Sequence, residues 1–84
     1  MTPAQRRAIA EKSWGTRVWE RRTQMGLTQG QVASIAGLTT GTVCRIEANK
    51  LAPRYRTMVA VSKALGCTVD DLFPFEAHPD RRVA

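Results

Sequence analysis

The chain has 84 residues, of which 43% are hydrophobic, so it can bury the small core of one domain but not of two. Thirteen Lys and Arg against seven Asp and Glu give a net charge of +6, which suits an anionic partner: nucleic acid, a membrane surface or an acidic protein. A membrane is disfavoured, because the apolar runs are far shorter than the ~20 residues of a spanning helix. The N-terminus also lacks the apolar segment of a secretory signal, so we expect a cytoplasmic protein.

The chain offers no recognisable centre for catalysis or for a metal ion. Cys44 and Cys67 are far apart, the single histidine is His78, and these spacings exclude the usual zinc sites. We interpret both cysteines as reduced, partly buried thiols. Asp70 and Asp71 fit the first turn of a helix better than a catalytic pair. We therefore expect no enzymatic activity, no cofactor and no metal.

The first third of the chain carries helical signals. Thr2 with Gln5 three residues later predicts a helix start. Apolar residues then recur on one face up to Gly26, either in one helix bent near Gly15 or in two helices with a break at Ser13. Three large side chains are expected in the core: Trp14, Met25 and Met58.

Capping residues and glycines divide the rest into four further helices. Their predicted starts are Thr28, Thr39, Tyr55 and Thr68, and Gly37 and Gly66 end two of them. No alternation of strand length is present. The sequence predicts an all-α, compact bundle of about five helices. It is a single domain over 1–84, with an N-terminal extension at 1–13, a helix pair at 28–47 and a tail at 74–84.

Residues 28–47 read as two short helices joined by a tight turn at Gly37, where glycine permits a positive φ. The second helix turns apolar residues to one side and short polar residues with Arg45 to the other. A compact helix pair with a small, polar, basic face is suited to the DNA major groove.

These residues resemble a known family over about 14–73. The matching pattern includes Arg22, Gly26-Leu27-Thr28-Gln29, Val32-Ala33, Ala36-Gly37-Leu38-Thr39, Thr42-Val43, Arg45-Ile46-Glu47 and Asn49-Lys50. It is similar to the Cro/phage-repressor helix-turn-helix family of the xenobiotic-response-element type, which includes phage repressors, restriction–modification controller proteins and antitoxins. The resemblance implies a lambda-repressor-like DNA-binding domain. It also implies a sequence-specific transcriptional regulator that binds double-stranded DNA as a homodimer at a two-fold symmetric operator.

The resemblance implies roles for individual residues. The base-facing positions are Thr40, Gly41 and Arg45, and an arginine can hold guanine by two hydrogen bonds. Gln29, at a helix N-terminus, is expected to hold a phosphate. The other positions expected to contact or flank the DNA backbone are Thr39, Thr42, Cys44, Asn49, Lys50, Arg54 and Arg56. The alternative for the cations is an ordinary solvated charge.

Three further expectations concern packing. The resemblance pairs Arg22 with Glu47 in a structural ion pair. Arg21 stands where the family has an apolar residue and Trp19 where it has a polar one, which we interpret as an exchange of roles through a small rotation of the helix. Arg54 replaces the small polar cap expected before the fourth helix.

The dimer interface is predicted at the C-terminal third, through Leu72, Phe73 and Phe75, which exceed what so short a helix needs to pack its own subunit. The alternative is that these residues cap the monomer core. Residues 1–13, with three cations, form either a basic arm or an extra packing helix. The alternative function is an antitoxin-type interaction protein whose DNA binding is secondary, so RNA polymerase and a toxin are further candidate partners.

Overall fold

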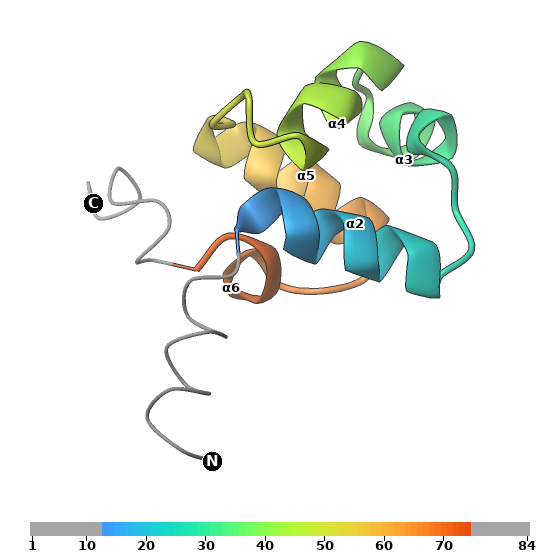
Figure 1. Cartoon of the computed structure of the whole chain (residues 1–84). Helices are drawn as coiled ribbons and strands as arrows, with labels where there is room; N and C mark the ends of the chain where they lie inside the picture. Colours follow the sequence, from blue (N-terminus) through green and yellow to red (C-terminus); the bar gives the residue numbers. More distant parts are fainter. Residues whose placement is uncertain (1–12, 75–84) are drawn as a thin grey trace.

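The computed structural model describes residues 13–74, which form five helices (Figure 1). In chain order they are α2 (Trp14–Gln24), α3 (Gln29–Ala36), α4 (Thr40–Glu47), α5 (Tyr55–Ala64) and α6 (Val69–Leu72). No strand occurs between residues 13 and 74. The predicted all-α bundle of five helices is therefore confirmed. The predicted helix start at Thr2 and the interface residue Phe75 lie outside the described residues.

Side-chain caps begin four of the five helices. The hydroxyls of Ser13 and Thr39 accept from the backbone N–H three residues later, and Thr28 and Thr68 do the same within full capping boxes. Each cap satisfies a donor that the first helical turn leaves without an internal partner. Because Ser13 is extended and caps α2, the helix begins at Trp14, and the alternative of one helix that continues through Ser13 and bends near Gly15 is wrong.

The turn between α3 and α4 is as tight as predicted. Gly37 adopts a left-handed conformation with φ 72°, and the N–H of Leu38 donates to the carbonyl of Ala33 at 2.8 Å. A side chain would disfavour this backbone conformation. The turn therefore fixes the angle between the two helices.

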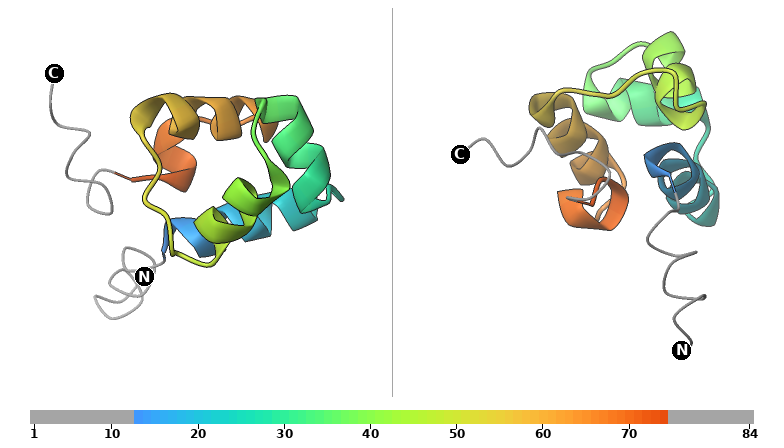
Figure 2. Two further views of the ribbon diagram at one scale, coloured as in Figure 1. Left: turned by 90° about the horizontal axis from the view of Figure 1, so that it is seen from above. Right: turned by 60° about the vertical axis from the view of Figure 1, so that its left-hand side comes forward.

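The α3–α4 pair lies over α2 and α5, and α6 closes the opposite side between them (Figure 2). All five helices contribute to one core, whose buried members are Val18, Val32, Ala33, Val43, Ile46, Met58, Val61, Ala64, Leu65, Leu72 and Phe73. Met58 is buried and Trp14 packs against the core, as expected. Met25 is 42% exposed, contrary to the prediction, because it follows the last turn of α2. None of the helices in the described part has the length and apolar character needed to cross a membrane.

The predicted interface residues Leu72 and Phe73 belong to the core of their own subunit. Their exposed fractions are 2% and 0%, so they offer no surface to a partner and the prediction that they form an exposed apolar patch is wrong. The physical reason is the shortness of α6. This four-residue helix packs its apolar C-terminal end between α2 and α5 and closes one side of the small core.

The expected exchange between Trp19 and Arg21 is also wrong. Trp19 is 50% exposed. Arg21 reaches instead across to the end of α5, where its Nε donates to the carbonyl of Leu65 at 2.9 Å and its Nη2 to that of Gly66 at 3.3 Å. An arginine suits an inward position when its stem packs along apolar surface and its guanidinium meets the last carbonyls of a helix.

Candidate nucleic-acid interface

The α3–α4 pair is positioned by small residues and by its inward apolar face. Val32 and Ala33 of α3 and Val43 and Ile46 of α4 are all buried. At Gly30, an added Cβ would lie 3.5 Å from the hydroxyl of Thr40, so the two helices start close together. With its apolar face held inward, α4 turns the opposite face to the surface.

That outer face of α4 consists of four exposed residues: Thr40, Gly41, Cys44 and Arg45. Their spacing of one, three and four positions places them on one strip of the helix. Nothing lies within 4 Å of a Cβ added at Gly41, so the space in front of the strip is open. We define these four residues as the α4 strip.

Thr39 and Thr42, which the sequence assigns to the DNA backbone, are engaged with each other. The Thr39 hydroxyl accepts from the N–H of Thr42 at 3.2 Å, and the two hydroxyls are 2.9 Å apart. Their first role is to cap α4, and Thr42 is half-buried.

The acid at the end of α4 is withdrawn from the surface. Glu47 accepts hydrogen bonds from Arg22 Nε at 2.6 Å and Arg22 Nη2 at 2.9 Å, and the two side chains are only 6% and 13% exposed. The hydrogen bond to Glu47 raises the pKa of Arg22. Arg22 Nη1 also donates to the carbonyl of Leu27 at 2.9 Å. The ion pair thereby links α2, α4 and the segment before α3.

Gln29, the expected phosphate ligand, joins this network. Its amide nitrogen donates to Glu47 Oε1 at 3.0 Å. One of its two N–H donors is therefore used within the protein, which orients the amide towards Glu47. The sequence assignment did not foresee this internal bond.

Asn49 is exposed, but its side chain is turned towards α2. Its Oδ1 accepts from the N–H of Gly15 at 3.0 Å and its Nδ2 donates to the Ser13 hydroxyl at 3.0 Å. The amide expected near DNA thus makes an interhelical contact. Lys50, the next residue, is exposed.

The N-terminus of α5 differs from the other four. Arg54 stands at the cap position and makes no side-chain cap hydrogen bond. Arg54, Tyr55 and Arg56 are all exposed, with Tyr55 at 57%. A helix N-terminus without a side-chain cap, flanked by two arginines, favours an anion. The sequence predicts the helix start at Tyr55, and this first helical position, beside the uncapped end, fits its exposure.

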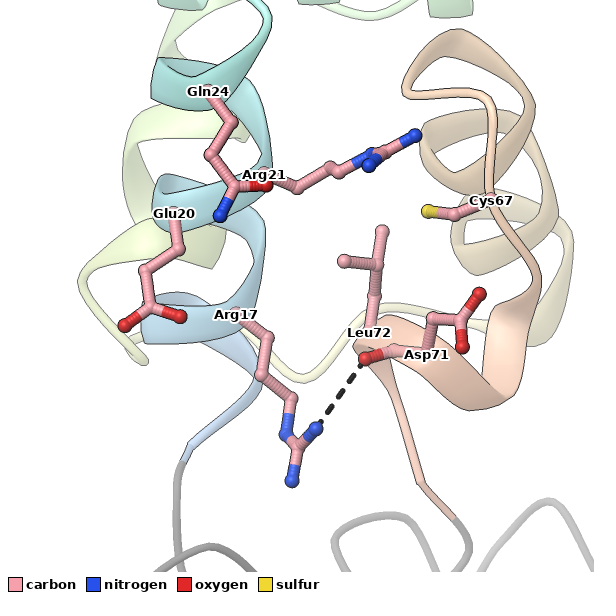
Figure 3. Close-up of a pocket in the computed structure, with 7 residues that line it drawn as sticks. All are labelled: Arg17, Glu20, Arg21, Gln24, Cys67, Asp71 and Leu72. Carbon is pink, nitrogen blue, oxygen red and sulfur yellow. Dashed lines mark hydrogen bonds between the residues drawn. The ribbon is translucent and has the colours of Figure 1, made fainter.

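A groove of about 400 Å³ lies between α2 and α6, on a different side of the bundle from the α4 strip (Figure 3). Its lining residues are Arg17, Glu20, Arg21, Gln24, Cys67, Asp71 and Leu72. Cations and acids are balanced there, Arg17 Nη1 donates to the carbonyl of Asp71 at 3.4 Å, and burial raises the pKa of the Cys67 thiol.

Both cysteines of the chain are free thiols. Among residues 13–74 no three His, Cys, Asp or Glu side chains are grouped so that they could hold a metal ion.

Comparison with known proteins gives one consistent result. The helix-turn-helix family model matches residues 20–72. The chain is 33% identical over 66 residues to the HTH-type transcriptional regulator PuuR of Escherichia coli strain K12. The matched region covers 79% of this chain but only 36% of PuuR. The chain therefore spans about a third of the length of that relative.

Two solved structures share the fold. The P22 c2 repressor, solved in complex with a synthetic operator, superposes with a TM-score of 0.70 at 26% identity, covering 73% of this chain and 92% of that one. The restriction–modification controller protein C.AhdI of Aeromonas hydrophila superposes with a TM-score of 0.69 at 28% identity, covering 71% and 91%. From its sequence match and its fold, the chain belongs to the helix-turn-helix family of the Cro/phage-repressor type.

Proposed function

We propose that the chain is a DNA-binding transcriptional regulator that places α4 in the major groove of duplex DNA. The observation that carries this proposal is the α4 strip, an exposed, short-chained polar surface with one arginine. The neighbouring acid, Glu47, is neutralised by Arg22 and accepts a hydrogen bond from Gln29. An unpaired carboxylate at that position would repel phosphate. The P22 c2 repressor, which shares the fold and was solved with operator DNA, supports the same docking.

Within the strip, Arg45 is proposed to read a base edge, because its guanidinium can donate two hydrogen bonds to guanine. Thr40 offers a methyl group that can pack against thymine. Gly41 adds no side chain, and the open space before it lets the helix approach the bases closely. Cys44 lies between these positions on the same face.

The backbone contacts are proposed to come from the residues after α4. Lys50, Arg54 and Arg56 are exposed cations, and the last two flank the uncapped N-terminus of α5. Phosphate contacts of this kind fix the register of a protein on DNA but carry no sequence information.

The proposal includes a homodimer on a two-fold symmetric operator, with the two α4 helices about one DNA turn, ~34 Å, apart. Since Leu72 and Phe73 are buried in the monomer, the interface must use other residues. We propose no catalytic activity, since the similar proteins are regulators. We propose a cytoplasmic location, which is consistent with a role in transcription.

The test is selection of bound sequences from a random duplex pool by the purified chain. We expect enrichment of a site whose two halves are related by two-fold symmetry. Arg45→Ala serves as the matched control and should enrich a more degenerate site at the same positions. A pool that stays random after repeated rounds with the wild-type chain would overturn the proposal.

A further inference from the structure

The first turn of α2 contacts the C-terminal end of α4. The N–H of Gly15 lies in the first turn of α2, where a helix has no internal acceptor to offer. Its acceptor is Asn49 Oδ1, 34 positions away, at 3.0 Å. Asn49 Nδ2 then donates to Ser13 Oγ at 3.0 Å, the hydroxyl that also caps α2. One amide therefore contacts both the cap and the first turn of the neighbouring helix.

Gly15 makes this approach possible. A Cβ built at this buried residue would overlap the Glu47 carbonyl and lie 2.8 Å from Asn49 Oδ1. Both neighbours belong to the end of α4, and one of them is backbone that cannot rotate away. The first turn of α2 is thus in direct backbone contact with the last turn of α4.

Asn49 also ends α4 through its backbone. It has φ 60°, the one non-glycine residue with positive φ between residues 13 and 74. Its N–H donates to the Ile46 carbonyl at 3.1 Å, and the N–H of Lys50 donates to the Arg45 carbonyl at 2.9 Å. Asparagine tolerates this conformation better than most residues, and glycine tolerates it best. A glycine would end the helix equally well but would lack the amide.

We propose that Asn49 and Gly15 form a positioning contact that holds the last turn of α4 in place for DNA recognition, and that Asn49 does not itself contact DNA. The inference rests on the proposed DNA binding. Arg45 lies one turn before Asn49, and its carbonyl is part of the turn that Asn49 closes. A small displacement of this end of α4 would misplace the Arg45 guanidinium. Bidentate contacts require placement within about 0.5 Å, so this loss should appear as lost sequence discrimination.

The decisive variant is Asn49→Gly, which keeps the left-handed backbone and removes the amide. We expect it to remain folded by circular dichroism and to bind random duplex within about two-fold of wild type. Its affinity for the selected operator should fall at least about tenfold, as misplaced reacting or binding groups do. Gly15→Ala, which changes a residue of α2 outside the α4 strip, should show the same pattern. Ser13→Thr should keep the wild-type ratio of operator affinity to random-duplex affinity, whereas Ser13→Ala should lower that ratio.

Lys50→Ala is the matched contact control and should weaken both duplexes alike, with a salt slope less steep by about one per subunit. If Asn49→Gly behaves like Lys50→Ala, or keeps its operator affinity, the inference is overturned. Should Gly15→Ala not fold, Asn49→Gly decides alone. Hydrogen exchange at the Gly15 amide reads the contact without DNA: we expect faster exchange in Asn49→Gly. Unchanged exchange would overturn the contact, whereas a wild-type chain that binds no duplex would overturn the proposed function.

Discussion

Arg22 and Glu47, 25 positions apart in the chain, face each other through two parallel hydrogen bonds of 2.6 and 2.9 Å. A bidentate arginine–carboxylate pair of this kind is a stronger interaction than a surface ion pair with a single hydrogen bond. It ties α2 to the end of α4, and Gln29 adds α3 to the same carboxylate. One nearly buried acid therefore connects three helices, and its negative charge is paired with Arg22 instead of facing solvent beside the α4 strip.

Arg22→Met should destabilise the fold by about 3 kcal/mol, because it leaves Glu47 largely buried with a single remaining hydrogen-bond donor, the amide of Gln29. Thermal or urea unfolding without DNA measures this effect. The double variant Arg22→Met/Glu47→Leu should recover much of the loss, since no charge is then left buried. A single variant as stable as the wild type would mean that the pair contributes nothing to folding.

Ser62→Ala should stabilise the protein. Ser62 is 2% exposed and its hydroxyl has no hydrogen-bond partner within the described chain. Removing a desolvated, unpaired hydroxyl should raise the free energy of unfolding by up to about 1 kcal/mol. The better helix propensity of alanine adds a separate gain. Ser34→Ala, at an exposed position of α3, controls for propensity alone. Equal gains in the two variants, measured by urea unfolding, would contradict the assigned cost of the buried hydroxyl.

The stability of the C-terminal turn should depend on acid pH through Asp71. The N–H of Thr68 donates to its carboxylate at 2.9 Å, and this bond, with that of the Thr68 side chain, lowers the pKa of Asp71. A carboxylate whose pKa is lower in the folded state stabilises the fold above its unfolded pKa of about 3.9, and the effect is lost as pH falls through the folded value. Asp71→Asn should therefore show a shallower loss of stability between about pH 5 and 2.

The same experiment in about 1 M salt separates hydrogen bonding from long-range charge, which is screened at that concentration. The difference between wild type and Asp71→Asn should persist, because hydrogen bonds are its main cause. A difference that vanishes in salt would assign it to neighbouring charges instead.

Local features of the fold could be predicted from the sequence because their causes are local. Thr28, Thr39 and Thr68 cap their helices, and Gly37 makes the turn, through bonds that span at most a few residues. The outer face of α4 follows from helical spacing alone. Together they bring the predicted base-facing residues Thr40, Gly41 and Arg45 to the exposed face of α4.

The errors concern side chains whose partners are distant in the chain. The place of Arg21 cannot be predicted from spacing, because its acceptors are carbonyls 44 and 45 positions away. The burial of Phe73 depends on how α6 fits between two other helices, which spacing does not show either. Spacing shows that Asn49 and Gln29 are near the site, but not that their amides are already engaged within the protein.

DNA binding should weaken steeply with salt. If each subunit contacts about four phosphates, a dimer contacts about eight, and the slope of log K against log[salt] should be roughly −7. Removing two contacts per subunit with Arg54→Ala/Arg56→Ala should make the slope less steep by roughly 3–4. Titrations from low to moderate salt measure both, and a wild-type slope shallower than about −2 would contradict the backbone contacts.

The central claim, that α4 reads bases through Arg45, is tested most directly by the ratio of the dissociation constants on a random duplex and on the selected operator. This ratio is measured for wild type and for Arg45→Ala, with the two duplexes of equal length. We expect Arg45→Ala to lose ~1–3 kcal/mol per site on the operator and much less on random DNA. Lys50→Ala should weaken both duplexes more evenly, since phosphates carry no sequence information. Equal losses for Arg45→Ala on the two duplexes would contradict the account.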